Sequence, residues 1–158
     1  MFDPFEVALS RQIVQDQTTS YHYFSNKIKG SGTPVGNQKD SGRCWIFACL
    51  SVIRVPFMRK YNINKFEFSQ AHIFFWDKIE RSHFFLNAIV KCALSGHTLD
   101  SRTMMCLLNN PVEDGGNWSM AVNIIKKYGL MPKLNFPESY NSNKSTQLND
   151  VLNSKASI

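Results

Sequence analysis

The pattern of apolar and polar positions predicts a chain built mainly from helices, with few convincing strands. Residues around Glu6–Gln17 are expected to form a short first helix, and the Gly-, Ser- and Pro-rich stretch Ser25–Asn37 an irregular loop. From Cys44 to Lys60 the chain is apolar almost all round, which is typical of a buried helix. Pro56 lies near the end of this run and is expected to kink or terminate the helix.

A second helix is predicted from about Gln70 to Ala93, because Ser69 is a good N-cap. Asp77 and Arg81 stand four residues apart within it, a spacing that favours an ion pair, and we expect them on an exposed side. The Phe/Trp stripe of residues 74–76 is interpreted as core rather than as part of a cofactor site.

Two further helices are predicted downstream. Arg102–Asn109 is expected to form a short one that ends before Pro111. Asn117–Tyr128 has the clearest amphipathic pattern, and Gly129 is expected to cap it. Its predicted apolar face consists of Trp118, Ala121, Val122, Ile125 and Tyr128, with Ile124 at the border.

Changes in composition divide the chain into three parts. Residues 1–32 form an N-terminal segment, and residues 33–140 form a helical lobe that contains Cys44. Residues 141–158 are rich in Asn, Ser and Lys and are expected to be a polar C-terminal tail, apparently truncated, with an amphipathic turn at Leu148–Leu152.

Composition and charge exclude several classes of function. A hydrophobic fraction of 43% provides enough apolar surface for a folded core. The net charge of +6 would suit nucleic acid, but the basic residues are scattered along the chain, so a nucleic-acid partner is not expected. The N-terminus lacks the pattern of a secretory signal and no apolar stretch could span a membrane, so we predict a cytoplasmic protein.

The four cysteines do not form the paired C-x-x-C spacing that a zinc site needs, so no metal site is predicted. They are Cys44, Cys49, Cys92 and Cys106, and free thiols are expected. Cys49 is interpreted as a core residue, and neither Cys92 nor Cys106 has neighbours that suggest chemistry.

Candidate chemistry lies in one segment around Cys44. Cys44 opens the predicted buried helix, and a helix N-terminus favours anions, so a thiolate is stabilised there. Gln38, six residues upstream, could place its side-chain amide beside the sulfur. Together with the backbone N–H of Cys44 it could hold the oxyanion of an attacked carbonyl group. A nucleophile and its oxyanion donors therefore come from one short stretch.

These residues resemble the papain-like cysteine proteases, whose pattern is Gln-x5-Cys-Trp. The longer string Asn37–Phe47 is similar to the bleomycin hydrolase branch of that family. Later motifs resemble it in the same order: Phe66-Glu67-Phe68-Ser69-Gln70 with Phe74-Phe75-Trp76-Asp77-Lys78, Asp114-Gly115-Gly116-Asn117-Trp118, Lys127-Tyr128-Gly129 and Phe136-Pro137-Glu138-Ser139-Tyr140. The similarity covers roughly residues 33–153.

The resemblance implies an α+β papain-like fold, of which this chain supplies mainly the helical left lobe while the β-rich right lobe is absent. It implies a cysteine-type aminopeptidase that cleaves peptides and small amides through a thioester on Cys44, with Gln38 stabilising the oxyanion. Gly115 and Gly116 would line the substrate cleft, with Trp45 beside the nucleophile. No cofactor or metal is implied, and the family assembles as a homohexamer.

The sequence also departs from the family pattern. Ser41 and Glu113 stand where secreted relatives have the two cysteines of a disulfide, which fits a cytosolic chain. The family's base is a histidine, oriented by an asparagine, in the second lobe, and the chain is expected to end before that lobe. The histidines present are interpreted as ordinary surface or core residues: His22, His72, His83 and His97.

Two alternatives follow from the missing base. One is a truncated, catalytically silent relative that acts at most as a peptide-binding or partner-binding lobe. The other is a fragment of a native chain that continues into a segment with the histidine and the asparagine. A nucleic-acid-binding module is a more distant alternative, which a steep salt dependence of binding would reveal.

Overall fold

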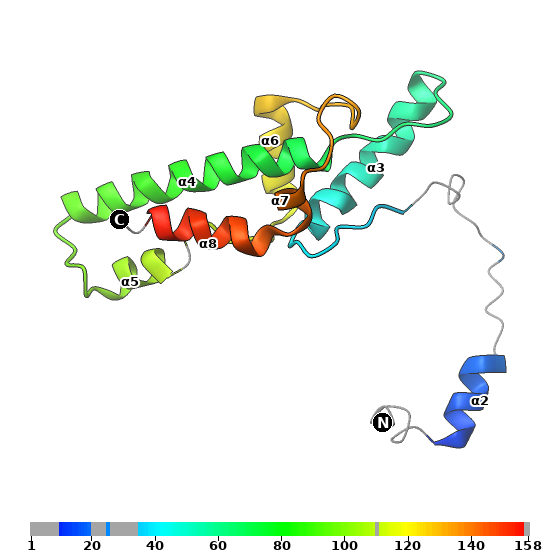
Figure 1. The fold of residues 1–158 in the computed structure, drawn as a ribbon, viewed down its shortest axis with the longest axis horizontal. Helices are drawn as coiled ribbons and strands as arrows, with labels where there is room; N and C mark the ends of the chain where they lie inside the picture. The colour runs from blue at the N-terminus through cyan, green and yellow to red at the C-terminus, as the bar shows by residue number, and fades with distance from the viewer. Residues whose placement is uncertain (1–9, 20–24, 26–34, 110, 157–158) are drawn as a thin grey trace. The chain divides into compact units, whose positions relative to one another are not determined.

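A computed structural model describes residues 10–19, 25, 35–109 and 111–156 (Figure 1). The chain divides into two units, Met1–Pro34 and Val35–Ile158. In the first unit the described residues form helix α2 (Arg11–Thr19), which overlaps the second half of the helix predicted for Glu6–Gln17. The beginning of that prediction, residues 6–9, lies outside the described residues.

The second unit is helical, as the apolar pattern predicts (Figure 1). Its described residues contain two isolated β-bridges and no longer strand, so the prediction of a mainly helical lobe is confirmed. Its helices are α3 (Cys44–Lys60), α4 (Gln70–Leu94), α5 (Arg102–Asn109), α6 (Trp118–Tyr128), α7 (Tyr140–Asn143) and α8 (Ser145–Ala156). The bounds of α3 and α5 are those predicted from the sequence, and those of α4 and α6 differ by one residue.

Helices α3, α4 and α6 pack against one another and enclose the core of this unit. The buried core residues are Trp45, Ile46, Cys49 and Leu50 of α3, Phe68 before α4, Ile73 and Phe74 of α4, and Ala121 and Ile124 of α6. The core position predicted for Cys49 is thereby confirmed. The predicted Phe/Trp stripe is core only in part, because Phe74 is buried whereas Phe75 is 47% exposed.

The ends of α4 and α6 are fixed by the caps that the sequence predicts. Ser69 Oγ accepts a hydrogen bond from the His72 N–H at 3.0 Å and caps α4. Asn117 caps the start of α6. Gly129 ends that helix with a left-handed φ of 74°, a conformation that glycine adopts without strain.

Of the two effects predicted for Pro56, a kink in α3 or its termination, termination is excluded, because the helix runs on to Lys60. Proline deprives the carbonyl of Val52, four residues earlier, of its helical hydrogen bond. Val52 is 63% exposed, so water can satisfy that carbonyl and the helix can continue.

Asp77 and Arg81 do form the predicted pair, but the prediction of an exposed side is wrong. The Asp77 carboxylate is 3% exposed and the Arg81 side chain 20%. Helix α6 and the loop before it pack on this part of α4. A pattern within one helix does not report such coverage by a segment some 35 positions away.

The buried face of α6 is largely the predicted one. Ala121 and Ile124 are buried in the core, and Ile125 and Tyr128 pack against it, whereas Trp118 is 55% exposed, contrary to the prediction. Trp118 is the first residue of the helix, one turn before the buried Ala121. Ile124, which was expected at the border of the apolar face, is one of the buried core residues of α6.

The C-terminal segment, interpreted from its composition as a polar tail, contains the end of α7 and all of α8. Helix α8 runs beside α4 (Figure 1), where Leu148 packs against the core. Asn153 Oδ1 accepts a hydrogen bond from the Val112 N–H at 3.1 Å. This segment therefore contacts two distant parts of the lobe.

Candidate active site

Cys44 is the first residue of α3, and its side chain is exposed. Both neighbours are buried: Arg43 is 0% exposed and Trp45 is 9% exposed. The next cysteine on the helix, Cys49, is buried, and burial raises the pKa of its thiol. The structure thus presents one exposed thiol at the N-terminal end of a well-anchored helix, the end at which the peptide dipoles are positive.

Gln38 and Cys44 are joined by the turn Gln38–Arg43, called the Gln38 loop below. Gln38 is half-buried, and its Oε1 atom is buried without a hydrogen-bond partner among the described residues. Its backbone carbonyl accepts hydrogen bonds from Ser41 Oγ at 2.6 Å and from Arg43 Nη2 at 3.4 Å. Lys39, the next residue, has a φ of 57°, which is rare for a residue with a side chain.

Arg43 connects the Gln38 loop to the distant residue Glu138. Its Nη1 atom lies 2.7 Å from Glu138 Oε2, and its Nε donates to Ser41 Oγ at 2.8 Å. The same Glu138 oxygen accepts a hydrogen bond from Ser142 Oγ of α7 at 2.6 Å. Because Arg43 is fully buried, this pairing also compensates a charge that water cannot reach.

The glycines Gly115 and Gly116 lie against the start of α3. A Cβ atom on Gly116 would be 2.7 Å from ring atoms of Trp45, so the backbone approaches the indole as closely as only glycine allows. Gly115 has a φ of 88° and donates its N–H to the carbonyl of Gly42 at 3.1 Å. The structure therefore brings both glycines and Trp45 together beside the Gln38 loop.

Asp114 links the Gln38 loop to two helices. Its Oδ1 pairs with Lys78 Nζ of α4 at 2.6 Å. Its Oδ2 accepts from the Gly42 N–H at 3.3 Å and from Ser145 Oγ of α8 at 2.5 Å. Burial opposes ionisation, but the hydrogen bonds from Lys78, Ser145 and Asn149 outweigh it and lower the pKa of Asp114 from 3.8 to about 2.

The neighbouring charges on α4 support the glycine segment. Arg81 Nε donates to both Asp77 oxygens, at 3.0 and 2.8 Å, and Arg81 Nη2 donates to the carbonyl of Gly115. Burial raises the pKa of Asp77, although Arg81 opposes that change. Burial likewise lowers the pKa of Lys78, against the effect of the Asp114 carboxylate.

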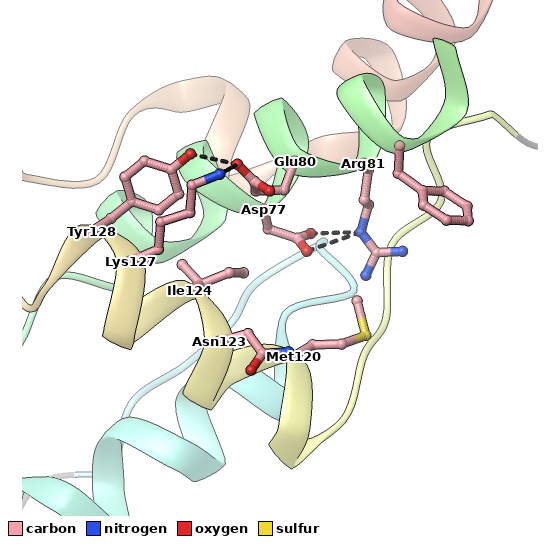
Figure 2. Close-up of a pocket in the computed structure, with 9 residues that line it drawn as sticks. Asp77, Glu80, Arg81, Met120, Asn123, Ile124, Lys127 and Tyr128 are labelled. Carbon is pink, nitrogen blue, oxygen red and sulfur yellow. Dashed lines mark hydrogen bonds and ion pairs between the residues drawn. The ribbon is translucent and has the colours of Figure 1, made fainter. Parts of the chain in front are cut away.

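A cavity of about 460 Å³ lies on the other side of these charges, between α4 and α6 (Figure 2). Figure 2 shows the Asp77–Arg81 pair at one end and Glu80 with Lys127 and Tyr128 at the other. Its lining includes neither Cys44 nor Gln38, so this cavity is separate from the candidate active site.

None of the described histidines has features that suggest a catalytic base. His72 is buried, and its ring lies against those of Trp76 and Phe136. His83 and His97 are exposed. His22 lies outside the described residues.

Sequence reasoning missed Arg43, Glu138 and Asp114 as parts of the site. One signal was present, because each belongs to a motif on which the resemblance rests, and motifs far apart in a chain can meet in the fold. A second signal was a charged side chain directly before an apolar helix, because such a side chain needs a partner if it is buried. Arg43 is such a residue, and its carboxylate partner lies 95 positions away.

Comparison with known proteins gives a consistent result. The profile of the Peptidase C1-like family matches residues 2–157, a longer range than the 33–153 covered by the motifs. The chain is 52% identical over 153 residues to bleomycin hydrolase of Gallus gallus, covering 97% of this chain and 33% of that protein. It is 47% identical over 120 residues to aminopeptidase C of Lactococcus lactis subsp. lactis, covering 76% of this chain and 27% of that protein.

Among solved structures, the chain resembles PepW from Lactobacillus rhamnosis with a TM-score of 0.81 and 41% sequence identity. The alignment covers 90% of this chain and 31% of that structure. The chain therefore spans about a third of the length of these relatives. In the part of the chain that the structure describes, no helix is long and apolar enough to cross a membrane.

Proposed function

Because the chain belongs to the Peptidase C1-like family, we propose that it provides the nucleophile side of a cysteine-type aminopeptidase that cleaves peptide and amide bonds through a thioester on Cys44. Relatives named bleomycin hydrolase and aminopeptidase C, about half identical over most of this chain, support the proposal. The chain spans about a third of their length, so the activity of the whole protein is part of the proposal.

The observation that best supports this function is the placement of Cys44. Its side chain is exposed at the first residue of α3, while Arg43 before it and Trp45 after it are buried. A cysteine kept only for packing would be buried, as Cys49 is. An exposed thiol held in a rigid frame at a helix N-terminus suits a nucleophile.

In the proposed reaction the Cys44 thiolate attacks the carbonyl carbon of the scissile amide. The carbonyl oxygen becomes an oxyanion, which the Gln38 side-chain amide and the Cys44 backbone N–H stabilise by hydrogen bonds. The C–N bond then breaks, the amine leaves with a proton, and a thioester of Cys44 remains. Water hydrolyses the thioester and restores the thiol.

Gly115, Gly116 and Trp45 are proposed to bind substrate. The side-chain-free backbone at Gly116, packed on the indole of Trp45, leaves room for an extended peptide to approach. The proton transfers need a base, which the family resemblance places on a histidine of a second lobe. We assign no described histidine to that role.

Location and assembly are further parts of the proposal. The cytoplasmic location is supported by Ser41 and Glu113 at the positions of a disulfide in secreted relatives, and by four cysteines that are all free. Homohexamer formation is inferred from the resemblance alone. Light scattering coupled to size-exclusion chromatography of the purified chain would test it.

The proposed function can be tested by labelling the cysteines of this chain at neutral pH and mapping the modified residues by mass spectrometry. Two probes separate the two features of the site. Iodoacetamide reports an accessible thiolate, whereas an epoxide also needs stabilisation of the alkoxide that forms as its ring opens. Cys106 is a second exposed cysteine and provides an internal reference in the same molecule.

We expect Cys44 to react faster than Cys106 with both probes. The variant Gln38→Ala should lower the epoxide rate at Cys44 by at least about tenfold, because it removes one oxyanion donor, and leave the iodoacetamide rate nearly unchanged. Equal, slow labelling of Cys44 and Cys106 would contradict the proposal. That result would favour a catalytically silent lobe that binds peptides or partners.

A further inference from the structure

Arg43 directly precedes the candidate nucleophile, and its side chain is among the most buried in the described part of the chain. Its guanidinium contacts three groups with three different nitrogen atoms: Ser41 Oγ, the Gln38 carbonyl and Glu138 Oε2. The rings of Phe47 and Phe74 lie 5.3 and 5.4 Å from its central carbon. Arginine at this position is therefore held in one orientation by both polar and aromatic contacts.

Two of these contacts converge on the backbone of Gln38. Ser41 Oγ accepts from Arg43 Nε and donates to the Gln38 carbonyl, and Arg43 Nη2 donates to the same carbonyl directly. The carbonyl oxygen of Gln38 thus receives one hydrogen bond from Arg43 and one from Ser41, whose hydroxyl Arg43 in turn contacts. Fixing a peptide group also fixes the direction in which its own side chain leaves the backbone.

The conformation of Lys39 shows why such support is needed. Its φ of 57° costs free energy for a residue with a Cβ atom and persists only where surrounding contacts impose it. The Asp40 backbone is bonded to Asn143 and Ser145 on the far side of the turn. On the near side, the contacts through Arg43 hold the Gln38 carbonyl, while the Lys39 N–H of the same peptide group donates to Asn37 Oδ1 at 2.8 Å.

We propose that Arg43 is a positioning residue that fixes the Gln38 side chain beside Cys44, with Glu138 holding the guanidinium in place. The inference rests on the proposed function, because it concerns the oxyanion donor of that reaction. Lysine cannot replace arginine here, since one ammonium group cannot reach Ser41, the Gln38 carbonyl and Glu138 in the fork geometry of a guanidinium.

The decisive variant is Arg43→Lys, which keeps the positive charge opposite Glu138. We expect it to lower the epoxide rate at Cys44 on the order of tenfold, because a small misplacement of a catalytic group has effects of this size. The iodoacetamide rate at Cys44 should change little. The double variant Arg43→Lys/Gln38→Ala should be no slower than Gln38→Ala alone, because Arg43 acts through Gln38.

Control measurements separate positioning from loss of fold. Buried Cys49 should stay unlabelled in every variant that is folded. Arg54→Lys is the matched substitution, since Arg54 is a largely buried arginine on the same helix that pairs with Glu67 instead. It should leave the ratio of epoxide to iodoacetamide rates unchanged.

The outcomes distinguish this inference from the proposed function. If Gln38→Ala has no effect on the wild-type epoxide rate, the proposed function fails. The positioning role is wrong if Gln38→Ala lowers the epoxide rate at Cys44 but Arg43→Lys does not. It is also wrong if the double variant is slower than Gln38→Ala alone. Should Arg43→Lys expose Cys49, the variant Ser41→Ala removes one of the two bonds to the Gln38 carbonyl. Ser41→Ala must then lower the epoxide rate at Cys44 without lowering the iodoacetamide rate, and it must add nothing to the effect of Gln38→Ala. An epoxide rate equal to that of the wild type would overturn the inference.

Discussion

Replacing Asp114 by asparagine should weaken the fold in a pH-dependent way. The carboxylate pairs with Lys78 of α4 at 2.6 Å and accepts hydrogen bonds from the Gly42 N–H and from Ser145 of α8. Lys78 Nζ has further partners in the carbonyls of Val112 and Glu113. Asp114→Asn keeps the size of the side chain, removes its charge and replaces one acceptor oxygen by an NH2 donor, so it tests the charge together with the hydrogen bonds that this oxygen accepts.

The expected loss in the free energy of unfolding at pH 7 is about 2 kcal/mol. The pKa of Asp114 of about 2, against an ordinary 3.8, gives this figure. Each tenfold change in proton affinity is worth about 1.4 kcal/mol, which comes to about 2 kcal/mol after allowance for partial exposure of the carboxylate. The figure already includes the pairing with the Lys78 ammonium, which is 7% exposed.

The sign of the pH dependence follows from the direction of the pKa change. A carboxyl group with a lowered pKa in the folded state stabilises the fold above its unfolded pKa and loses that effect as the pH falls through the folded value. The difference between wild type and Asp114→Asn should therefore be constant above about pH 5 and fall by about half near pH 3. Asp77, whose pKa burial raises, acts in the opposite sense, and the Asp114 charge contributes to that raised pKa, so the substitution also weakens this smaller opposing effect.

Urea unfolding, followed by helical circular dichroism between pH 7 and pH 3, measures this difference. Asp150→Asn is the matched control, because Asp150 is an exposed aspartate on α8. The double variant Asp114→Asn/Lys78→Met should be more stable than Asp114→Asn alone, since no buried charge then lacks a partner. A loss below about 0.5 kcal/mol, or one that does not shrink in acid, would refute the electrostatic account.

Three further substitutions test other features of the lobe. Gly116→Ala should cost about 1–3 kcal/mol of unfolding free energy and shift the fluorescence of Trp45, because its Cβ atom would lie 2.7 Å from the indole; unchanged emission would contradict that contact. Ser69→Ala should cost about 1–2 kcal/mol in urea unfolding, since it removes the cap on the His72 N–H and a donor to a backbone carbonyl; Thr should restore most of it. Pro56→Ala should stabilise the chain by about 1–3 kcal/mol in thermal melting, because it restores a helical N–H at an exposed position; a lower melting temperature would count against the account of this helix.

Most of the helices could be predicted because their signals are local. The caps at Ser69, Asn117 and Gly129 lie within one turn of the residues they bond, and the apolar run of α3 needs no knowledge of its neighbours. The wrong predictions concern burial. Asp77 is covered because another segment packs on α4, which a charged pair at helical spacing does not reveal.

The candidate site shows the same division. Gln38 and Cys44 are six residues apart, so one motif predicts that they lie close together. Gly115 and Gly116 could be placed only through the family resemblance, because nothing local to them indicates Trp45 as a neighbour. Neither the local motif nor the family resemblance predicted that Glu138 pairs with Arg43, because charge pairing at a separation of 95 residues leaves no periodic pattern in the sequence.

The C-terminal segment shows why composition was misleading about the site. Hydrophobicity identifies segments that build a core, and residues 141–156 contribute little to it. Their polar groups nevertheless complete both supports of the Gln38 loop: Ser142 bonds Glu138, the partner of Arg43, and Ser145 bonds Asp114, the partner of Gly42. Hydrogen bonds and ion pairs of this kind can open locally while the α3, α4 and α6 core stays packed. The geometry around Cys44 therefore depends on a segment that adds little to the core, and this dependence is visible only once the fold places that segment beside the loop.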